Sequence, residues 1–309
     1  MIKSYIDTPA TDISLIGSGH INETYLVTAG GQYILQKMNA SLYGRQRSVL
    51  RHNYLEYRRA VTRAGEDWLA PEWLTDRKGH FFHVDENGDL WRMYEYIPSD
   101  RPLESKSSDM NIYEIGRGLG TLHRILRGCD DIRVVETTAH LHDLRYHYDR
   151  YLEASETDVA RDAELDELID LNIEYLLSLS VPRSYIIHGD AKVSNMIISD
   201  GKVRGFIDLD TIMPGSIFDD LADCARSCCL DREGHFDADK VVHLHRGYEE
   251  GYDAIFTPDA IDLLGRCLVR NRFMLGIRYY TDYLTGGNYF GRDRSGQNLE
   301  RAREQLKML

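Results

Sequence analysis

The stretch His188-Gly189-Asp190-Ala191-Lys192-Val193-Ser194-Asn195 is the most informative part of the 309-residue chain. Asp190 and Asn195 stand five positions apart, and Asp208 follows at the end of a predicted strand-turn-strand. A short hairpin returns the chain to its starting point, so we expect Asp208 to lie beside Asn195. Carboxylate and amide oxygens are the ligands that Mg²⁺ prefers. The stretch therefore predicts a magnesium site next to a further carboxylate, that of Asp190.

This arrangement fits phosphoryl transfer from ATP. That reaction needs a carboxylate to accept the proton of the substrate hydroxyl, and oxygen ligands that hold Mg²⁺ against the phosphates. Asp190 is the candidate catalytic base, and Asn195 and Asp208 are the candidate Mg²⁺ ligands. His188 is interpreted as an organiser of the loop, its ring bonding backbone groups. The alternative, that Asp190 and Asn195 are turn residues closing a hairpin, explains one turn but not the whole run with Asp208.

Candidate nucleotide-binding residues occur upstream in the expected order. Gly17, Ser18 and Gly19 stand between two predicted strands, where small residues let backbone amides approach phosphates. Lys37 ends the next strand and is predicted to contact the α and β phosphates, with Glu56 on the following helix as its partner. Each prediction has a plain alternative: a Gly-Ser-Gly hairpin turn, a surface lysine, and a glutamate that neighbouring arginines of its helix capture instead.

The periodicity of apolar residues divides the chain into two lobes. Residues 1–97 are typical of antiparallel strands with one helix over residues 45–63, and end in a hairpin over residues 81–97. Pro98 interrupts that strand because proline has no amide hydrogen to donate. Residues 98–309 read mainly as helices, over 110–127, 164–180, 237–255 and 259–284. We therefore predict an α+β fold with a small antiparallel N-terminal nucleotide-binding lobe, 1–97, and a larger helical catalytic and substrate-binding lobe, 98–309.

The charge of the chain, −13, limits its partners. Residues 1–97 carry 11 basic and 12 acidic side chains, so the deficit lies almost wholly in residues 98–309. An acidic chain argues against a nucleic-acid partner, because duplex binding rests on phosphate neutralisation. No apolar run approaches the roughly 20 residues of a membrane span, which predicts no membrane partner. Five cysteines, an odd number, indicate reduced thiols and a cytoplasmic location.

Two histidine pairs have spacings that metal sites also use. They are His140 with His142, and His243 with His245. Neither pair has a cysteine or a third clustered ligand nearby in the sequence, so neither is predicted to bind a metal ion.

Beyond these motifs, nearly the whole chain resembles the aminoglycoside phosphotransferase and choline kinase superfamily, which has a protein-kinase-like bilobal fold. Within it, the sequence is most similar to the N-acetylhexosamine 1-kinase group. The stretches that carry the likeness are 17–25, 33–39, 91–97, 188–195, 207–215, 220–226, 276–284, 288–290 and 298–301. Asp208-Leu-Asp-Thr-Ile-Met-Pro-Gly215 is specific to that group, whereas the bare His-Gly-Asp-x₄-Asn pattern is shared by the superfamily.

The resemblance implies further roles by position. Asp190, Asn195, Asp208 and Lys37 keep the roles given above. The residues implied on the sugar side are His20, Asp210, Arg226, Arg278 and Tyr289. Fixed donors and acceptors of this kind suit sugar hydroxyls, and arginine presents a rigid fork of donors.

The expected activity is that of an ATP- and Mg²⁺-dependent small-molecule kinase, a phosphotransferase with an alcohol group as acceptor. The leading hypothesis is phosphorylation of the anomeric hydroxyl of a hexose or N-acetylhexosamine. An alternative keeps the fold but takes an aminoglycoside, a choline-like amine or an amino alcohol, which the acidic large lobe would also suit. A third hypothesis, a catalytically silent kinase-fold binding protein, is disfavoured by the intact Asp190, Asn195 and Asp208.

Overall fold

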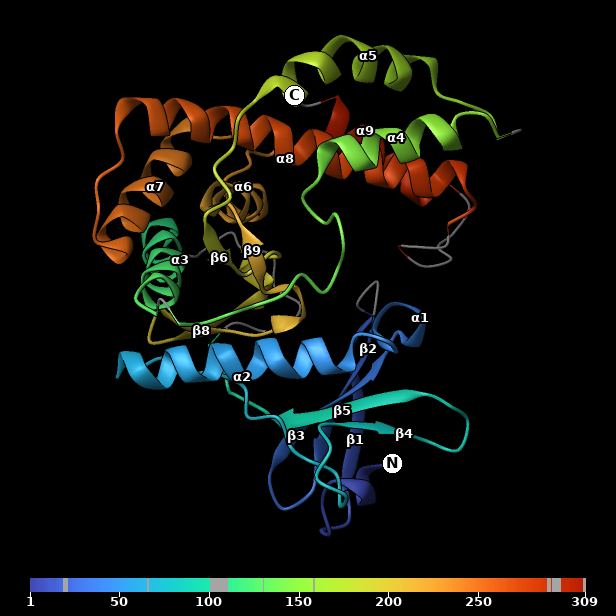
Figure 1. Ribbon diagram of the computed structural model, residues 1–309, viewed down its shortest axis with the longest axis vertical. Coiled ribbons are helices and arrows are strands. Elements are labelled where there is room, and N and C mark those ends of the chain that lie inside the picture. The colour runs from blue at the N-terminus through green and yellow to red at the C-terminus, as the bar shows by residue number, and fades with distance from the viewer. Residues whose placement is uncertain are drawn as a thin grey trace.

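The computed structural model describes residues 1–18, 22–65, 67–100, 111–129, 131–157, 159–287, 290 and 296–307. A small sheet-containing lobe and a larger, mainly helical lobe lie on either side of helix α2 (Figure 1). This confirms the predicted fold class. The boundary near residue 97 stays a prediction; it falls between strand β5 and helix α3.

The strands are β1 (Asp12–Ser18), β2 (Glu23–Thr28), β3 (Gln32–Met38), β4 (Phe82–Val84), β5 (Leu90–Glu95), β6 (Tyr185–Ile187), β7 (Met196–Ser199), β8 (Lys202–Phe206) and β9 (Met213–Gly215). The helices are α1 (Ala40–Tyr43), α2 (Arg47–Ala64), α3 (Ile112–Arg127), α4 (Leu144–Ala154), α5 (Ala163–Ser178), α6 (Ile217–Cys228), α7 (Ala238–Tyr252), α8 (Pro258–Leu284) and α9 (Gln297–Leu306).

The small lobe is built on one antiparallel sheet with strand order β1-β2-β3-β5-β4. Successive side chains of a strand point to opposite faces, and here both faces are covered. Leu35 of β3 packs with Met93 of β5 in a cluster that the N-terminal segment covers. Ile34 and Met38, on the other face of β3, belong to the main core of the protein. A side chain's position along β3 therefore decides whether it faces the rest of the molecule.

Helix α2 joins the two lobes. Its buried side chains recur at helical spacing, including Leu50, Tyr54 and Tyr57, and it ends at Gly65, which has the left-handed conformation common at this position (φ 65°). Asn53 faces the large lobe, where its Nδ2 donates to the carbonyl oxygens of Val135 (2.7 Å) and Ile212 (3.0 Å). The amide of Val135 donates back to Asn53 Oδ1 (2.9 Å). These bonds fix the helix against the large lobe.

Helices α3 and α7 cross at very close range, because glycines line both sides of the crossing. A Cβ atom placed on Gly116 or Gly120 of α3 would lie 2.0 or 2.2 Å from a backbone carbonyl oxygen of α7. A Cβ on Gly247 or Gly251 of α7 would lie 1.9 or 2.0 Å from one of α3. Backbone therefore packs directly on backbone, and the crossing leaves no room for a side chain at these four positions.

We expect Gly247→Ala to lower the free energy of unfolding by about 1–3 kcal/mol, the usual effect of overpacking. The added methyl group would meet the carbonyl oxygen of Tyr113, which is backbone and cannot rotate away. Chemical denaturation of both proteins measures the change. Gly265→Ala is the matched control: Gly265 is exposed on α8, and an added Cβ there meets nothing within 4 Å. Alanine is the better helix former by about 1 kcal/mol, so a loss of stability in the control as large as in Gly247→Ala would contradict this explanation.

Helix α8 is the longest helix and organises the far side of the large lobe. Thr257 caps its N-terminus by accepting the amide of Ala260 (3.3 Å), and Pro258 follows in the first turn, where proline costs no hydrogen bond. The helix packs against α4, α6 and α9 (Figure 1). Neither α8 nor any other helix in the described ranges is long and apolar enough to cross a membrane.

Candidate active site

The stretch 188–195 and Asp208 come together as the hairpin spacing predicted. A 3₁₀ turn over Val193–Asn195 leads into β7, and β8 runs back antiparallel to it. The amide of Ile207 donates to the carbonyl oxygen of Asn195 (2.8 Å), which places the next residue, Asp208, beside Asn195. Asp208 has a left-handed backbone (φ 59°, ψ 53°). That conformation is uncommon outside glycine, asparagine and aspartate, and sharply turns the chain at the site.

Asp190 is held by two donors. Lys192 Nζ donates to its Oδ2 at 2.5 Å, and Asn195 Nδ2 donates to the same oxygen (3.0 Å) and to the Asp190 carbonyl oxygen (2.8 Å). Burial raises the pKa of Asp190, but the ammonium group of Lys192 lowers it by more. The resulting pKa is about 2, below the ordinary value of 3.8. The carboxylate is therefore ionised at neutral pH. Among the described residues both side-chain bonds fall on Oδ2, which leaves Oδ1 to meet a substrate hydroxyl.

The loop that carries Asp190 is anchored from behind by Asp220 of α6. This carboxylate is fully buried and accepts the amides of His188 (2.7 Å) and Gly189 (2.8 Å). It also contacts His123 Nε2 at 3.0 Å, and His123 Nδ1 contacts the hydroxyl of Tyr248 at 2.8 Å. A buried chain of bonds thus links the loop to α3 and α7.

The imidazole of His188 contacts backbone on both sides. Its Nε2 lies 3.0 Å from the carbonyl oxygen of Ile207, and its Nδ1 accepts the amide of Asp190 (3.3 Å). Since a carbonyl oxygen only accepts, Nε2 carries the hydrogen in this arrangement. The ring therefore ties the loop to the end of β8, next to Asp208.

Two cavities meet at Asp208. One, of about 390 Å³, is lined by Asp190 and by polar side chains of α6 and α8; we call it the Asp190 cavity. The other, of about 220 Å³, lies between the small-lobe sheet and the β7–β8 hairpin and is lined by Asn195; we call it the Asn195 cavity. The walls of both include Thr24, Gln36 and Asp208. A group bound at Asp208 would therefore face both cavities.

Asn195 and Asp208 fit a hard cation. The amide nitrogen of Asn195 is used on Asp190, so its side-chain oxygen is the atom left for a metal. Burial and the nearby carboxylate of Asp210 raise the pKa of Asp208 to about 6, against an opposing effect of Lys192. Burial and Asp210 disfavour the ionised form of this carboxylate, so a bound cation would stabilise it strongly. This is the behaviour expected of a Mg²⁺ ligand.

The raised pKa of Asp208 predicts that magnesium binding weakens in acid. Its folded-state value, about 6, exceeds the ordinary 3.8, so between these values the folded protein holds a proton that the unfolded chain has released. This proton stabilises the metal-free fold as the pH falls, and Mg²⁺ must displace it. We expect MgCl₂ with a non-hydrolysable ATP analogue to raise the melting temperature strongly at about pH 7.5 and weakly at about pH 5.

Thermal shift measurements at both pH values, with nucleotide alone as the reference, separate this effect from the titration of the nucleotide itself. Asp208→Asn should lose most of the Mg²⁺-dependent shift at either pH. Equal shifts at the two pH values in the wild-type protein would contradict the assignment of Asp208.

Most aspartates between positions 208 and 223 have a partner side chain, some nearby in the sequence and some far away. Asp219 pairs with Arg270 (3.1 Å), Asp223 pairs with Arg226 (2.6 Å), and Asp220 contacts His123, as described above. Asp210 pairs with Arg92 of β5 and both side chains are almost fully buried. Among the described residues, Asp208 is the member with no ion-pair partner.

Asp210 does not lie on the substrate side of the site, contrary to the role implied by the resemblance. Arg92 donates to both of its carboxylate oxygens, one at 3.1 Å, and Asp210 lines neither cavity. The same guanidinium donates to Gln36 Oε1 (2.5 and 3.2 Å) and lies over the ring of Trp73. The pair is therefore buried in the protein interior, close enough to Asp208 for its charges to act on that carboxylate.

Lys37 and Glu56 are not brought together, and neither lines the Asp190 cavity or the Asn195 cavity. Lys37 pairs with Asp89 at 2.7 Å, and Glu56 pairs with Arg59 and accepts the amide of Arg133. The reason lies in strand alternation: Ile34 and Gln36 face the cleft, so Lys37 points to the other face of the sheet. Gln36, which sequence reasoning overlooked, is a polar β3 side chain that lines both cavities. The alternation of Ile34 and Gln36 along the strand could have revealed it.

The remaining candidate residues divide into three groups. Arg226 of α6 and Arg278 of α8 line the Asp190 cavity. Gly17 and Ser18 belong to β1, where Gly17 pairs with Thr24. Three candidates lie outside the described residues, namely Gly19, His20 and Tyr289. Sequence reasoning did not find other polar residues of the Asp190 cavity, including Lys192, His142, Thr211 and Asn271.

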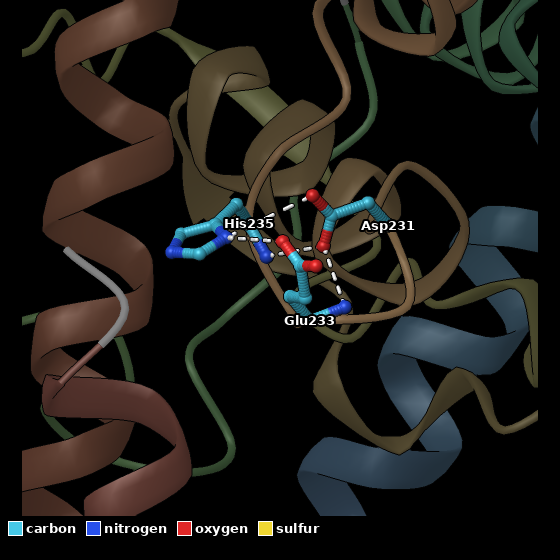
Figure 2. A group of neighbouring side chains, drawn as sticks. All are labelled: Asp231, Glu233 and His235. Atoms are coloured by element: carbon cyan, nitrogen blue, oxygen red, sulfur yellow. Dashed lines mark hydrogen bonds and ion pairs between the residues drawn. The ribbon is translucent and has the colours of Figure 1, made fainter.

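Away from the cleft, Asp231, Glu233 and His235 gather on the surface between α6 and α7 (Figure 2). All three are exposed. A local turn explains their proximity, because Asp231 Oδ1 accepts the amides of both other residues at 2.9 Å. Neither of the two His-x-His pairs takes part in a metal-like group among the residues that the structure describes.

Comparison with known proteins agrees with this geometry. The small sheet lobe, the helical lobe and the Asp190–Asn195–Asp208 cluster between two cavities define a kinase-like phosphotransferase fold. The chain belongs to the phosphotransferase enzyme family, whose model matches residues 12–254.

Several solved structures share the fold at low identity. An amicoumacin kinase in complex with AMP-PNP, Ca²⁺ and amicoumacin is 14% identical, with a TM-score of 0.66 over 99% of this chain and 90% of that chain. A microcompartment-associated aminopropanol kinase is 18% identical, with a TM-score of 0.66 over 99% and 93%. A macrolide 2′-phosphotransferase from Brachybacterium faecium is 18% identical, with a TM-score of 0.60 over 95% and 91%.

Proposed function

We propose that this protein is an ATP- and Mg²⁺-dependent kinase that phosphorylates the anomeric hydroxyl of a hexose or N-acetylhexosamine. The observation that carries the proposal is the position of Asp208, which lines both the Asp190 cavity and the Asn195 cavity. A phosphate group bound there would reach from the donor nucleotide on one side to the acceptor hydroxyl on the other. Membership of the phosphotransferase enzyme family supports the same class of reaction.

The Asn195 cavity suits the adenine base. Its walls include Ile16 and Ile34 from the sheet and Met196 and Ile207 from the hairpin region, so apolar side chains lie on both sides. Tyr94 and Tyr96 add aromatic surface. A flat heteroaromatic ring gains by burial between such walls. The triphosphate would then extend toward Asp208.

The chain's own residues would act in the Asp190 cavity. Asp190 orients the acceptor hydroxyl through Oδ1 and takes its proton as the new P–O bond forms. Lys192 keeps the carboxylate ionised and lies close enough to meet the transferred phosphate. Asn195 and Asp208 would hold Mg²⁺, which supplies positive charge against the phosphates during transfer.

The acceptor is proposed from two considerations. The stretches shared with the N-acetylhexosamine 1-kinase group favour a sugar. The Asp190 cavity is lined by three carboxylates and three cationic side chains within the described ranges, a balance that gives an ammonium group no special advantage. This balance disfavours the alternative acceptors, the amines and amino alcohols.

Phosphate transfer from radiolabelled ATP to a panel of free hexoses, N-acetylhexosamines, choline, ethanolamine and an aminoglycoside tests the proposal. We expect Mg²⁺-dependent transfer to at least one sugar and none to the amines. Alkaline phosphatase-sensitive, acid-labile product would identify an anomeric phosphate. Transfer to amines alone would establish the alternative, and absence of any transfer or any Mg²⁺–ATP thermal shift would support the silent binding protein.

A further inference from the structure

Three residues that line the Asp190 cavity each carry a buried polar atom that lacks a hydrogen-bond partner among the described residues. They are His142 (Nδ1), Thr211 (Oγ1) and Asp223 (Oδ2). Buried polar groups in native proteins are normally paired, because leaving one unpaired is unfavourable. Three unpaired groups around one cavity indicate positions that a bound molecule completes.

His142 presents an acceptor next to the catalytic loop. Its Nε2 lies 3.0 Å from the carbonyl oxygen of Gly189, the residue before Asp190. A carbonyl oxygen only accepts, so Nε2 carries a hydrogen, and in a neutral imidazole Nδ1 then offers a lone pair. The residue is 5% exposed, so bulk water reaches it poorly and a ligand hydroxyl is the natural donor.

Thr211 and Asp223 line the same cavity. Thr211 packs against the loop so closely that a Cβ on Gly189 (φ +82°) would lie 2.3 Å from its carbonyl oxygen. Asp223 is 8% exposed, and its Oδ1 accepts both hydrogen bonds from Arg226 (2.6 and 3.1 Å). Oδ2 therefore remains as a second acceptor whose charge Arg226 already balances.

These features together specify the chemistry of the ligand. The two acceptor atoms require hydrogen donors, whereas the threonine hydroxyl can donate or accept. The balanced charge of the cavity favours a neutral molecule over an ammonium compound. We propose that His142, Thr211 and Asp223 determine acceptor specificity by binding at least two further hydroxyl groups of a neutral polyol, besides the one that Asp190 activates. This inference rests on the proposed function and assigns residues to its acceptor site.

Steady-state kinetics of Thr211→Val and Asp223→Asn test the assignment with the best sugar found in the acceptor panel. Valine keeps the shape of threonine without the hydroxyl, and asparagine turns Oδ2 into a donor. We expect KM for the sugar to rise about 10- to 100-fold, as for a hydrogen bond to a buried group left unmade, with kcat and KM for Mg²⁺–ATP changed about threefold or less. Thr211→Ser restores the hydroxyl and should recover most of the affinity. Thr121→Val on α3 is the matched control for the loss of a threonine hydroxyl outside the cavity.

Monodeoxy analogues of that sugar locate the contacts. For the wild-type protein, removing the hydroxyl that a residue binds should raise KM about as much as the corresponding variant does. With that analogue the variant and the wild-type protein should have nearly the same KM, because the interaction is already absent in both. Thermal unfolding confirms that each variant is folded.

The outcomes separate the two proposals. Wild-type transfer to a sugar, with both variants indistinguishable from Thr121→Val in KM, would overturn the assignment and leave the sugar kinase intact. Wild-type transfer to amines and to no sugar would overturn both. A rise in KM that Thr211→Ser reverses, and that one deoxy analogue abolishes, supports the assignment.

Discussion

Replacing Asp190 with asparagine is expected to lower kcat for phosphate transfer by about 100- to 10,000-fold, the range that a positioned general base contributes. Asparagine has nearly the same shape but cannot take the proton of the acceptor hydroxyl. The variant also lacks the negative charge that pairs with Lys192 at 2.5 Å. The Lys192 ammonium group would then have no carboxylate partner and could bind phosphate instead. KM for Mg²⁺–ATP should change far less than kcat, because the nucleotide is proposed to bind in the Asn195 cavity.

Single-turnover and steady-state measurements on the best acceptor provide the comparison. Asp200→Asn is the matched control, since Asp200 is exposed in the turn between β7 and β8 and its backbone (φ 52°) tolerates asparagine. The control should keep wild-type kinetics. If Asp190→Asn retained more than about one tenth of the activity while Mg²⁺–ATP still stabilised it, Asp190 would not be the base, given the usual contribution of such a group.

The proximity of Asp190, Asn195 and Asp208 was predictable from the sequence because the three residues lie close together along the chain. Asp190 and Asn195 share one loop, and a two-stranded hairpin fixes where Asp208 returns. Such relations depend on turn geometry and spacing rather than on distant packing. The division into a sheet lobe and a helical lobe was predictable for a similar reason, since the periodicity of apolar residues is a local property.

Predictions about single charged side chains were weaker, and Lys37 shows why. The strand itself was correctly placed, but its two faces are both covered, so hydrophobicity alone did not reveal which face meets the cleft. A shift of one residue reverses the direction of a strand side chain. The predicted pairing of Glu56 with Lys37 does not form for another local reason. Arg59 lies one turn along the same helix and pairs with Glu56 at 2.7 Å.

The remaining features depend on pairs that are far apart in the sequence. Arg92 and Asp210 are 118 positions apart, and the bond from His142 to Gly189 spans 47. No spacing rule connects such residues. The glycines of α3 and α7 are an intermediate case: each helix carries two glycines four residues apart, a pattern that indicates close helix packing, but the partner helix becomes evident only in the fold.

A second large effect is expected at Asp220, which holds the loop that carries Asp190 through the amides of His188 and Gly189. Asp220→Asn should lower the free energy of unfolding by about 3 kcal/mol or more, because hydrogen bonds to a buried charged group are strong and an unpaired buried donor is costly. The carboxylate accepts two loop amides and contacts His123. Asparagine keeps one accepting oxygen, and its NH₂ group would face a donor.

The pH dependence of unfolding distinguishes this explanation from general damage. Burial raises the pKa of Asp220, but His123 and the loop amides lower it more, so the folded value lies below the ordinary one. Its contribution to stability is therefore present above about pH 4 and is lost as the pH falls through the depressed folded-state value. Asp220→Asn should remove that part of the acid dependence, so the stability difference from wild type should shrink below about pH 4.

The effect of Asp220→Asn on activity should fall on kcat more than on the KM values, because Asp220 contacts the loop and lines neither cavity. Asp239→Asn, an exposed change on α7, is the matched control and should leave stability and kinetics unchanged. Equal losses of stability at all pH values would show that the carboxylate charge is not what holds the loop. Normal kcat in a stably folded Asp220→Asn would show that Asp190 needs no support from α6, because a displaced base loses rate steeply with distance.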